Sequence, residues 1–515
     1  MQLPALRIAR EMGWYVAAAD GNPEAEGRSL CHHFFPVDLK DVPALIESAR
    51  TLRDGRGLHG VFTAGTDFSL SVAEVAEAFG LPGHSGKAAR AATDKRLMRE
   101  AFLKAGVPSP DFIEVGPDDD ASACAAKVPG PWVVKPVDSM GARGVVRIDR
   151  DVELPEALDA ARKYSRSGRA LLESYMEGPE YSLDALVENG RLIRCGLADR
   201  HITYSPRFIE IGHTIPTKQT RANIEILWDA FEHGVKALGL THGAAKGDVK
   251  LTRAGPMIGE IAARLSGGYM SGWTWPYASD VEPTRGGLRL AVGLDAEVHR
   301  EEALRVCAER ALIGIDGTIR TLNGREEALA LPGVKEVFLR YGAGDKLVFP
   351  RNNVEKAGNV ITVGADWNEA EQRALAALRT LRMELDPRDD TTGVFLDDRT
   401  DFPPDAFPLD DTGRFAAYLE SLWSDSPPKP SRGRRGEGPL SIQSLPESAA
   451  DSSCNCHDVI GRTPLDCLEV LQREGFLEWA PDNDSNRDTQ TASDFWKALI
   501  RGGLAGARWY LERRI

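Results

Sequence analysis

Two hydrophobic periodicities alternate along the first part of the chain. Apolar residues recur at helical spacing over 3–12 and 42–52, and short apolar runs at 14–20 and 60–65 lie between and after them. Helices that alternate with short strands are typical of an α/β unit with a parallel sheet. The first recognisable element is already a helix, so we expect a doubly wound domain without its first strand. We expect the missing strand and glycine turn to be encoded upstream of Met1.

The alternation of helices and strands continues beyond residue 90. The pattern predicts a helix over 92–108, with Thr93 as its N-cap and with Gly106 and Pro108 ending it. Strands are predicted at 131–137, 145–148 and 170–176, with a polar glycine loop after the first strand and a helix through Arg162 after the second.

A hairpin is predicted near the middle of the chain, where two alternating apolar runs flank Arg-Ala-Gly-Pro. If the hairpin is symmetric about Ala254, Asp248 lies opposite Glu260, with both side chains on one face. Two carboxylates about 5 Å apart repel by about 3 kcal/mol at a dielectric near 20. A hard divalent cation such as Mg²⁺ would turn this repulsion into chelation, and Arg264 shares the face of Glu260. The alternative is a solvent-facing hairpin of ordinary charges.

A different pattern follows residue 300. Strands around 331–348, a loop and a helix over 366–381 predict a small α+β subdomain. Residues 424–453 are rich in proline, serine and glycine and contain few core-forming residues, which is typical of a linker or a disordered segment.

The end of the chain carries an amphipathic pattern, with apolar residues at Phe495, Leu499, Leu504 and Leu511. Such a helix could contact a membrane surface or a partner, or it could dock on its own domain.

Composition narrows the class of protein. The chain has 515 residues, enough for about three domains. It is 42% hydrophobic and 27% charged, and its net charge of −14 argues against a general nucleic-acid binder. No apolar run approaches the ~20 residues of a membrane span, and the first residues do not resemble a secretory signal.

Cysteine usage favours a reducing compartment. The seven cysteines are an odd number and are mostly scattered, so we expect a cytoplasmic protein. Only Cys454, Cys456 and His457 are clustered, and they lack a second pair at zinc spacing.

The common nucleotide-binding motifs are absent. The segment GHSGKA fails the G-x-x-x-x-G-K-[ST] pattern, and no strand leads into G-x-G-x-x-G. However, Lys135 ends a buried strand, and a loop with Ser139, Gly141 and Gly144 follows it. Glycines let backbone N–H groups approach a phosphate, and a neighbouring lysine supplies charge. A plain glycine hairpin with a surface lysine is the alternative.

Five motifs, in this order, resemble those of the ATP-grasp superfamily over about residues 2–386. They are TDK at 93–95, VVKPVDSMGARG at 133–144, LLESYMEGPEYSLDAL at 171–186, GHTIP at 212–216, and GDVKL at 247–251 followed by GEIAARLSGG. The form Glu260-Ile-Ala-Ala-Arg264 is similar to that of the amino-acid ligase branch, and residues 301–386 look like its C-terminal subdomain.

The resemblance implies an α/β ATP-grasp fold with five parts. These are a pre-ATP-grasp α/β domain (1–90), an ATP-grasp domain of two α+β lobes around an ATP cleft (91–300), a small α+β subdomain (301–388), a partly disordered linker (389–453) and a helical tail (454–515).

The resemblance also implies roles for individual residues. Lys95 and Lys135 would reach the ATP phosphates, under a loop containing Ser139, Gly141 and Gly144. Adenine would meet the backbone of a hinge, and Glu180 would bond the ribose; the hinge residues are Glu173, Ser174, Tyr175 and Met176. Asp248 and Glu260 would hold Mg²⁺ or Mn²⁺, and Arg264 would stabilise the transferring phosphoryl group.

Substrate residues and departures from the family pattern are less specific. His213, Ser266 and Gly267 are candidates for the substrate pocket, which Trp273 and Trp275 could also line. Many ATP-grasp enzymes have asparagine where this chain has Ala262, and Ala262 cannot ligate a second metal.

The implied activity is that of an ATP-dependent carboxylate–amine ligase, which forms an amide through an acyl phosphate and releases ADP and phosphate. Its partners would be small carboxylates and amines, with no nucleic acid and no membrane span, and it could form a homodimer. The alternatives are a carboxylase-like enzyme that activates bicarbonate and a nucleotide-binding subunit without catalysis. Both lysines, both carboxylates and Arg264 are present, which argues against a decayed centre.

Overall fold

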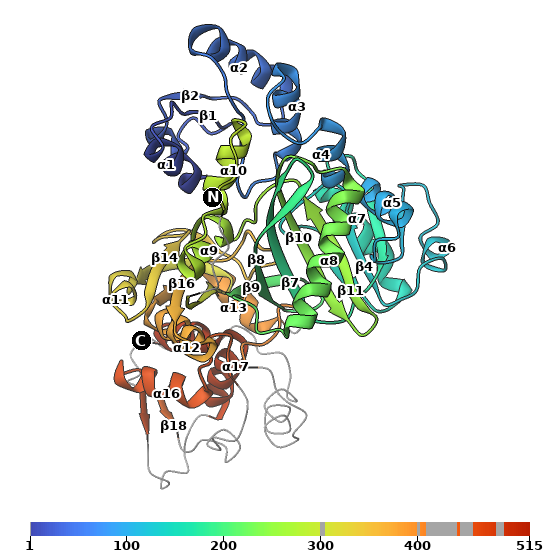
Figure 1. Cartoon of the computed structure of the whole chain (residues 1–515). Coiled ribbons are helices and arrows are strands. Elements are labelled where there is room, and N and C mark those ends of the chain that lie inside the picture. Colours follow the sequence, from blue (N-terminus) through green and yellow to red (C-terminus); the bar gives the residue numbers. More distant parts are fainter. Residues whose placement is uncertain are drawn as a thin grey trace. The chain divides into compact units, whose positions relative to one another are not determined.

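The computed structural model describes residues 2–298, 304–398, 402–407, 440–442, 457–479 and 489–514. The chain divides into two compact units. The first unit comprises residues 1–309 and 361–371, and the second comprises 310–360 and 372–515. Each unit is described by itself below, and Figure 1 labels the elements.

The first unit begins with the predicted helices and a small parallel sheet. Its elements are α1 (Leu3–Glu11), β1 (Ala17–Ala19), η1 (Glu26–Leu30), β2 (His33–Phe35), α2 (Val42–Arg56) and α3 (Ser69–Phe79). Strands β1 and β2 pair in parallel. The strand predicted at 60–65 is wrong, because this segment has no regular structure. Gly60 lies directly against a backbone carbonyl, where an added Cβ would come within 2.3 Å of Ala291 O.

Two short helices replace the single helix predicted over 92–108. Helix α4 (Gly86–Thr93) ends where that helix was expected to begin, and α5 (Lys95–Ala105) follows it. The N-cap of α5 is Asp94, not Thr93, because the Asp94 carboxylate accepts hydrogen bonds from the N–H groups of Arg96 and Leu97. Gly106 ends the helix in the left-handed conformation, as predicted.

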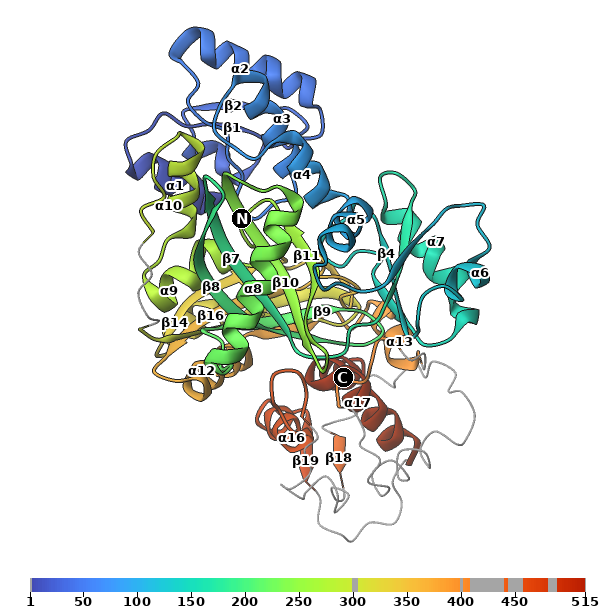
Figure 2. The same cartoon turned by 45° about the vertical axis from the view of Figure 1, so that its right-hand side comes forward.

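The next part is a four-stranded sheet in the order β3-β6-β4-β5. Its elements are β3 (Phe112–Val115), α6 (Ala121–Ala125), β4 (Trp132–Pro136), β5 (Val146–Ile148), η2 (Asp151–Glu153), α7 (Leu154–Tyr164) and β6 (Ala170–Ser174). Helix α7 packs against β4, β5 and β6, as Figure 2 shows for β4. Leu154, Leu158 and Leu172, all at most 1% exposed, form the centre of its core.

A larger antiparallel sheet contains five consecutive strands of this unit in the order β11-β10-β7-β8-β9. Its strands are β7 (Glu180–Glu188), β8 (Arg191–Thr203), β9 (Ile209–Ile215), β10 (Gly243–Thr252) and β11 (Gly255–Ala262). Helix α8 (Arg221–Leu238) packs on β10 and β11. Its apolar side, which includes Leu227 and Phe231, is fully buried against the sheet. The face of β10 that points away from α8 carries the polar side chains of Lys246 and Asp248. Three more helices follow β11: η3 (Met270–Thr274), α9 (Trp275–Ser279) and α10 (Pro283–Ala291).

The second unit contains the predicted small subdomain. Two of its strands, β12 (Val306–Leu312) and β16 (Gly358–Gly364), and helix α12 (Trp367–Thr380) extend across the chain positions that divide the units. The others are β13 (Gly317–Asn323), α11 (Arg325–Leu329), β14 (Val334–Leu339), β15 (Lys346–Leu347) and β17 (Arg382–Leu385). Strands β15, β13 and β17 form an antiparallel sheet.

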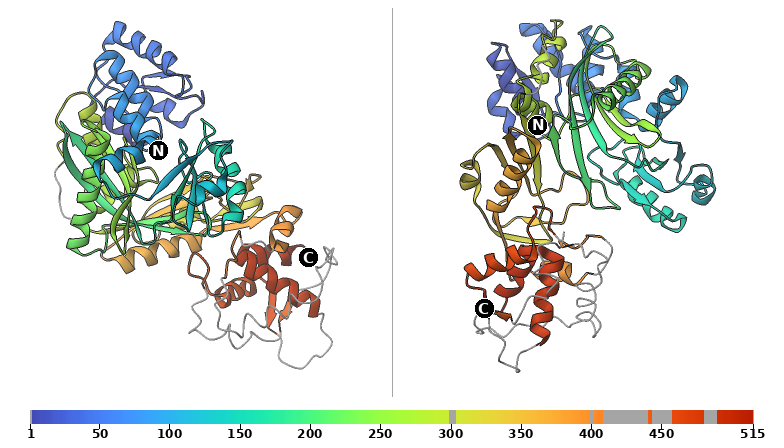
Figure 3. Two further views of the ribbon diagram at one scale, coloured as in Figure 1. Left: turned by 90° about the vertical axis from the view of Figure 1, so that its right-hand side faces the viewer. Right: turned by 60° about the horizontal axis from the view of Figure 1, so that its bottom comes forward.

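The predicted tail helix packs within this second unit. The tail elements are α13 (Asp390–Asp397), β18 (Leu440–Ile442), α16 (Pro464–Arg473), β19 (Leu477–Trp479) and α17 (Thr489–Glu512), and α17 is kinked at Gly503. Figure 3 shows α16 and α17 in red, side by side. Phe495 and Leu499 are fully buried, and the indole of Trp509 donates a hydrogen bond of 3.0 Å to Asp386 O. Docking within its own unit is therefore the alternative that the structure favours.

The predicted linker begins later than expected. Residues 390–397 form α13, which Asp389 caps and which buries Thr392 and Phe395. The proline-rich part of 424–453, Cys454 and Cys456 lie outside the described residues, apart from β18. No helix in the described ranges combines the length and the hydropathy that are needed to cross a bilayer.

Candidate active site

The β10–β11 hairpin pairs Asp248 with Glu260, as predicted, but for a different reason. The turn is centred between Arg253 and Ala254, since Thr252 pairs with Gly255. That register alone would set Asp248 opposite Gly259. A one-residue β-bulge after Asp248 leaves Gly259 without a partner residue and restores the pairing with Glu260. The bulge therefore brings the two carboxylates to one face.

Cations surround both carboxylates. Asp248 pairs with Lys246 on its own strand, and its Oδ1 lies 2.9 Å from Nη1 of Arg200 on β8. Glu260 Oε2 lies 3.7 Å from Nζ of Lys95 at the start of α5. Burial raises the pKa of Glu260, but Lys95, Lys246, Lys135 and Arg264 together lower it to about 2. The carboxylate is thus ionised at neutral pH, and the repulsion between the pair is offset by neighbouring charge.

This arrangement fits a divalent cation that keeps most of its coordination sites for other ligands. Asp248 Oδ1 is buried and has the Arg200 guanidinium as its ionic partner, so a bound cation would share this oxygen with Arg200 or displace the guanidinium. No group of three or more metal-binding side chains occurs in the described part of the chain. Two carboxylates with phosphate and water oxygens are a common Mg²⁺ environment, and Ala262 contributes no oxygen ligand from its side chain.

A third acidic residue, Glu173 on β6, forms an ion pair with Lys135. Glu173 Oε2 lies 2.7 Å from Lys135 Nζ, and its Oε1 accepts a hydrogen bond of 2.9 Å from Nε of Arg99. Burial lowers the pKa of Lys135 to about 8, although Glu173 raises it. Burial raises the pKa of Glu173, but Arg99 and Lys135 lower it below its usual value. Sequence reasoning assigned Glu173 to the hinge and missed this side-chain role.

Several backbone groups of the hinge residues 173–176 already form hydrogen bonds within the protein. Ser174 N–H donates to Asp111 O at 2.9 Å, and Tyr175 N–H donates to Pro131 O at 2.8 Å. Lys250 Nζ donates to Met176 O at 3.2 Å and lies 5.0 Å from the ring centre of Tyr175. An adenine at this hinge would therefore not use the N–H groups of Ser174 and Tyr175, which already donate within the protein.

The glycine loop between β4 and β5 is positioned by tight packing. Gly141 and Gly144 have φ angles of 70° and 69°, which only glycine adopts without strain. A Cβ on Gly144 would lie 2.9 Å from Tyr164 and 3.2 Å from Ala161 Cα, so the loop rests directly on α7. Ser139 O accepts a hydrogen bond of 2.7 Å from Lys95 Nζ. The two predicted phosphate-binding features are thus joined to each other.

Glu180 and Arg200 form the far end of the same polar face. Glu180 on β7 is paired in register with Arg200 and with Lys250, and it forms an ion pair with Arg200. Arg200 also contacts Glu210 at 2.7 Å. Burial raises the pKa of Glu180. Sequence reasoning missed Arg200 and Lys246, although the spacing Lys246-x-Asp248-x-Lys250 already indicated a charged face.

Arg264, Ser266 and Gly267 follow β11 directly. Arg264 is 8% exposed; its Nη1 donates to Leu265 O at 2.9 Å, and its buried Nε has no hydrogen-bond partner among the described residues. Ser266 N–H donates to Asp184 Oδ1 at 2.8 Å, and Gly267 is half-buried beside it.

The other substrate candidates are buried. His213 is fully buried, with its Nε2 2.8 Å from the Thr274 hydroxyl and its Nδ1 3.3 Å from Glu309. Trp273 is buried too, and the ring of Trp275 packs on Gly196 so closely that a Cβ there would lie 1.9 Å from it. The geometry of Trp275 favours core packing.

Comparisons with known proteins place the chain among related sequences and structures. The family described as "ATP-grasp domain" matches residues 128–272, and "L-amino acid ligase C-terminal domain 2" matches residues 311–386. "Uncharacterized protein y4rH" of Sinorhizobium fredii is 26% identical over 377 residues, which cover 72% of this chain and 77% of the relative.

Two further similarities concern a synthase and a ligase. Human carnosine synthase 1 is 27% identical over 291 residues; the match covers 52% of this chain but only 35% of that relative. The crystal structure of L-amino acid ligase from Bacillus licheniformis has a TM-score of 0.65 at 22% identity, covering 75% of this chain and 96% of that one. The structural likeness shows that the two chains share a fold.

Proposed function

We propose that this chain, an ATP-grasp ligase of the amino-acid ligase branch, joins a small carboxylate to an amine through an acyl phosphate. The observation that carries the proposal is the pair of opposed carboxylates, Asp248 and Glu260, with Lys95 3.7 Å from Glu260 and with Lys135, Lys246 and Arg264 close enough to lower its pKa. A cluster of positive charge beside two opposed carboxylates suits a polyphosphate with a bound divalent cation.

The positions of the side chains support the following binding steps. Lys95 and Lys135 neutralise phosphate oxygens, and the loop with Ser139, Gly141 and Gly144 supplies backbone N–H groups to them. Asp248 and Glu260 would hold Mg²⁺ or Mn²⁺, which supplies positive charge to the phosphates. Glu180 bonds the ribose at the other end of the polar face, where Arg200 orients its carboxylate.

The chemical steps need positioning more than acid–base catalysis. A carboxylate oxygen of the substrate attacks the γ-phosphorus of ATP, and ADP leaves. Arg264, with its unpaired Nε, stabilises the negative charge on the transferring group and on the acyl phosphate. The amine then attacks the acyl carbon, and inorganic phosphate leaves as the amide forms.

The expected compartment and substrates agree with this activity. The cytoplasmic location is proposed from the odd number and the scattered positions of the cysteines in the sequence. Small carboxylates and amines are the substrates that the family implies.

Product analysis tests the proposal. Purified protein is incubated with Mg-ATP and pooled amino acids, and ADP, phosphate and new amide masses are measured. Release of AMP and pyrophosphate would show adenylation and would contradict the acyl phosphate. ADP release that depends on bicarbonate, with no new amide, would instead support the carboxylase-like alternative.

A further inference from the structure

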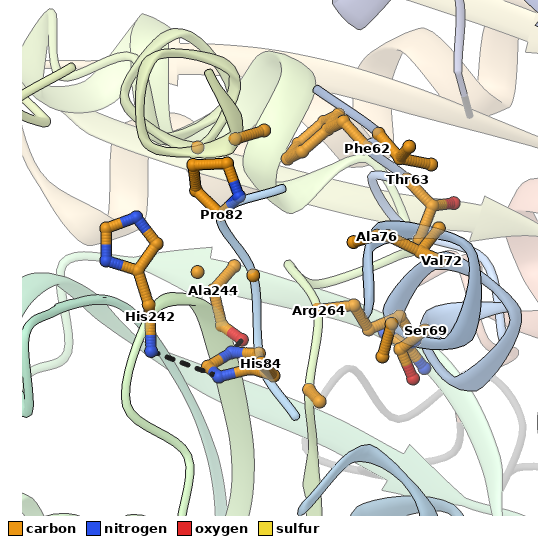
Figure 4. A pocket seen from close by; sticks show the side chains of 17 residues that line it. Phe62, Thr63, Ser69, Val72, Ala76, Pro82, His84, His242, Ala244 and Arg264 are labelled. Atoms are coloured by element: carbon orange, nitrogen blue, oxygen red, sulfur yellow. Dashed lines mark hydrogen bonds between the residues drawn. The ribbon is translucent and has the colours of Figure 1, made fainter. Parts of the chain in front are cut away.

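A small cavity lies beside Arg264 in the first unit. Its volume is about 50 Å³, and its walls come from residues 61–63, α3, the segment before α4, the start of β10, the residues directly after β11, and α10. Figure 4 shows His84 and His242 on one side of this cavity and Arg264, Ser69 and Val72 on the other. Arg264 is thus shared between the cavity and the candidate active site.

The cavity continues the charged face of the β10–β11 hairpin. Ala244, which lines it, lies on the same face of β10 as Lys246 and Asp248, because side chains alternate along a strand. Asp248 lies four positions after Ala244 along β10, which is about 13 Å at the usual rise per residue. A molecule whose carboxylate meets Arg264 could therefore extend away from the proposed metal site into the cavity.

The lining of the cavity is mostly apolar. Phe62, Val72, Ala76, Pro82, Ala244 and Ala291 provide most of its walls. The two histidines of the lining are occupied by the backbone: His84 Nε2 donates to Ala244 O at 2.9 Å, and His242 Nε2 lies 3.0 Å from Leu290 O. Burial lowers the pKa of His84 to about 4, so it is neutral at physiological pH. A buried charge on a ligand would find only Arg264 as its ionic partner.

The cavity is also short. Its volume equals that of about three to five ordered water molecules, which suits a side chain of only a few carbon atoms. A longer ligand side chain could not extend toward α10, because the packing there is tight: a Cβ on Gly287 would already lie 2.8 Å from the ring of Phe62.

We propose that this cavity holds the side chain of the carboxylate substrate and that it selects a short, uncharged, apolar side chain. The inference rests on the proposed ligase function, in which Arg264 stabilises the phosphoryl group as it is transferred to the substrate carboxylate. Val72 is a specificity-determining residue, because it lines the cavity and is only half-buried, so that its size can change without a full rearrangement of the core.

The experiment identifies the carboxylate by trapping it. Full-length protein is given Mg-ATP, hydroxylamine and one amino acid at a time: alanine, valine, phenylalanine, aspartate or lysine. Hydroxylamine nitrogen attacks the acyl carbon of an acyl phosphate, phosphate leaves, and the hydroxamate reports which carboxylate was activated. We expect alanine and valine to have the highest kcat/KM, and aspartate and lysine to fall by about 100-fold or more.

Two variants change the cavity and one serves as a control. Val72→Phe should raise KM for valine by about tenfold or more while alanine is less affected, and Val72→Ala should improve phenylalanine by about tenfold. Val75→Ala is the matched control, because Val75 lies on the same helix and is 4% exposed but does not line the cavity.

Each outcome decides between the two proposals. If aspartate or lysine is the best substrate, or if the Val72 variants shift KM no more than Val75→Ala does, the inference is overturned while the ligase function stands. If no amino acid yields hydroxamate or ADP, the proposed function itself is overturned, and the inference with it.

Discussion

Glu173 and Glu260 are both carboxylates surrounded by cations, but their side chains are 3% and 30% exposed. Both oxygens of Glu173 have cationic partners within 3 Å, from Arg99 and Lys135. The nearest cation to Glu260 is Lys95, at 3.7 Å. Glu173 is thus part of a closed cluster that positions Lys135, whereas Glu260 remains open to a ligand.

The difference between the two sites follows from their secondary structure. Glu173 is on the central strand β6, where it is paired in register with Phe112 and Val133. Its side chain contacts Lys135 on β4 and Arg99 on α5. Glu260 follows a β-bulge, which turns the strand and leaves its side chain at the open face. We therefore expect changes at the first site to affect folding and changes at the second to affect catalysis.

Arg99→Met should cause the largest loss of stability. The change leaves the buried Glu173 with Lys135 as its only cation and removes the 2.6 Å hydrogen bond from Arg99 to Gly259 O. Breaking a buried ion pair commonly costs about 3–5 kcal/mol. Hydrogen exchange of α5 and β6 measures this loss within the first unit. Arg96→Met is the control, because Arg96 is on the same helix in a 31% exposed pair and should cost at most about 1 kcal/mol. Equal losses would contradict the closed-cluster interpretation.

Glu260→Gln should leave the nucleotide pocket intact but stop catalysis. The variant removes a proposed metal charge and no adenine contact, so ADP formation should fall by about 10²–10³ or more, while ATP still binds without metal. Equilibrium titration with Mn²⁺ should show weaker metal binding. Glu225→Gln on the exposed side of α8 is the control and should retain full activity. Normal turnover by the Glu260 variant would make Asp248 and Glu260 mere surface charges.

Sequence patterns predicted helices that correspond to α1, α2, α5, α7, α12 and α17, strands that correspond to β4, β5 and β6, and the β10–β11 hairpin with its opposed carboxylates, but they did not predict α8 or the strands β7, β8 and β9. They did not predict the bulge at Gly259, because a hairpin register that is counted from the turn assumes one residue opposite each residue. They placed the cap of α5 at Thr93, whereas the carboxylate of Asp94 is the side chain that reaches the free N–H groups.

The side-chain role of Glu173 was also outside what a sequence pattern can predict. Its two cations come from α5 and β4, and only the folded chain brings these elements together. The cluster of positive charge around Glu260 has the same origin, because Lys246 and Lys95 lie far apart in the sequence.

Arg264→Met should separate catalysis from binding. The arginine acts chiefly when charge develops during phosphoryl transfer, so turnover should fall by about 10²–10³, while Mn²⁺ and ATP still bind. Arg264→Lys keeps the charge and should recover part of the rate, because its ammonium cannot reproduce the guanidinium geometry. A parallel loss of ATP affinity in Arg264→Met would place this side chain in the nucleotide pocket instead of at the transferring group.

The smallest expected effect is the pH dependence of KM for ATP, which depends on the protonation of Lys135 in the closed cluster. Burial lowers the pKa of Lys135 to about 8 in the folded protein, below its usual value. The folded chain therefore loses this proton before the unfolded chain does, so the contribution of Lys135 to stability rises as the pH increases above 8. Its charge on the ATP phosphates is lost over the same range, and KM for ATP should rise by up to about tenfold per pH unit. Stability and affinity for ATP thus change in opposite directions.

Lys135→Arg is the control for this prediction, because arginine stays charged at every pH and should abolish the rise in KM. A wild-type KM for ATP that stays constant between pH 8 and 10 would show that Lys135 does not contact the phosphates.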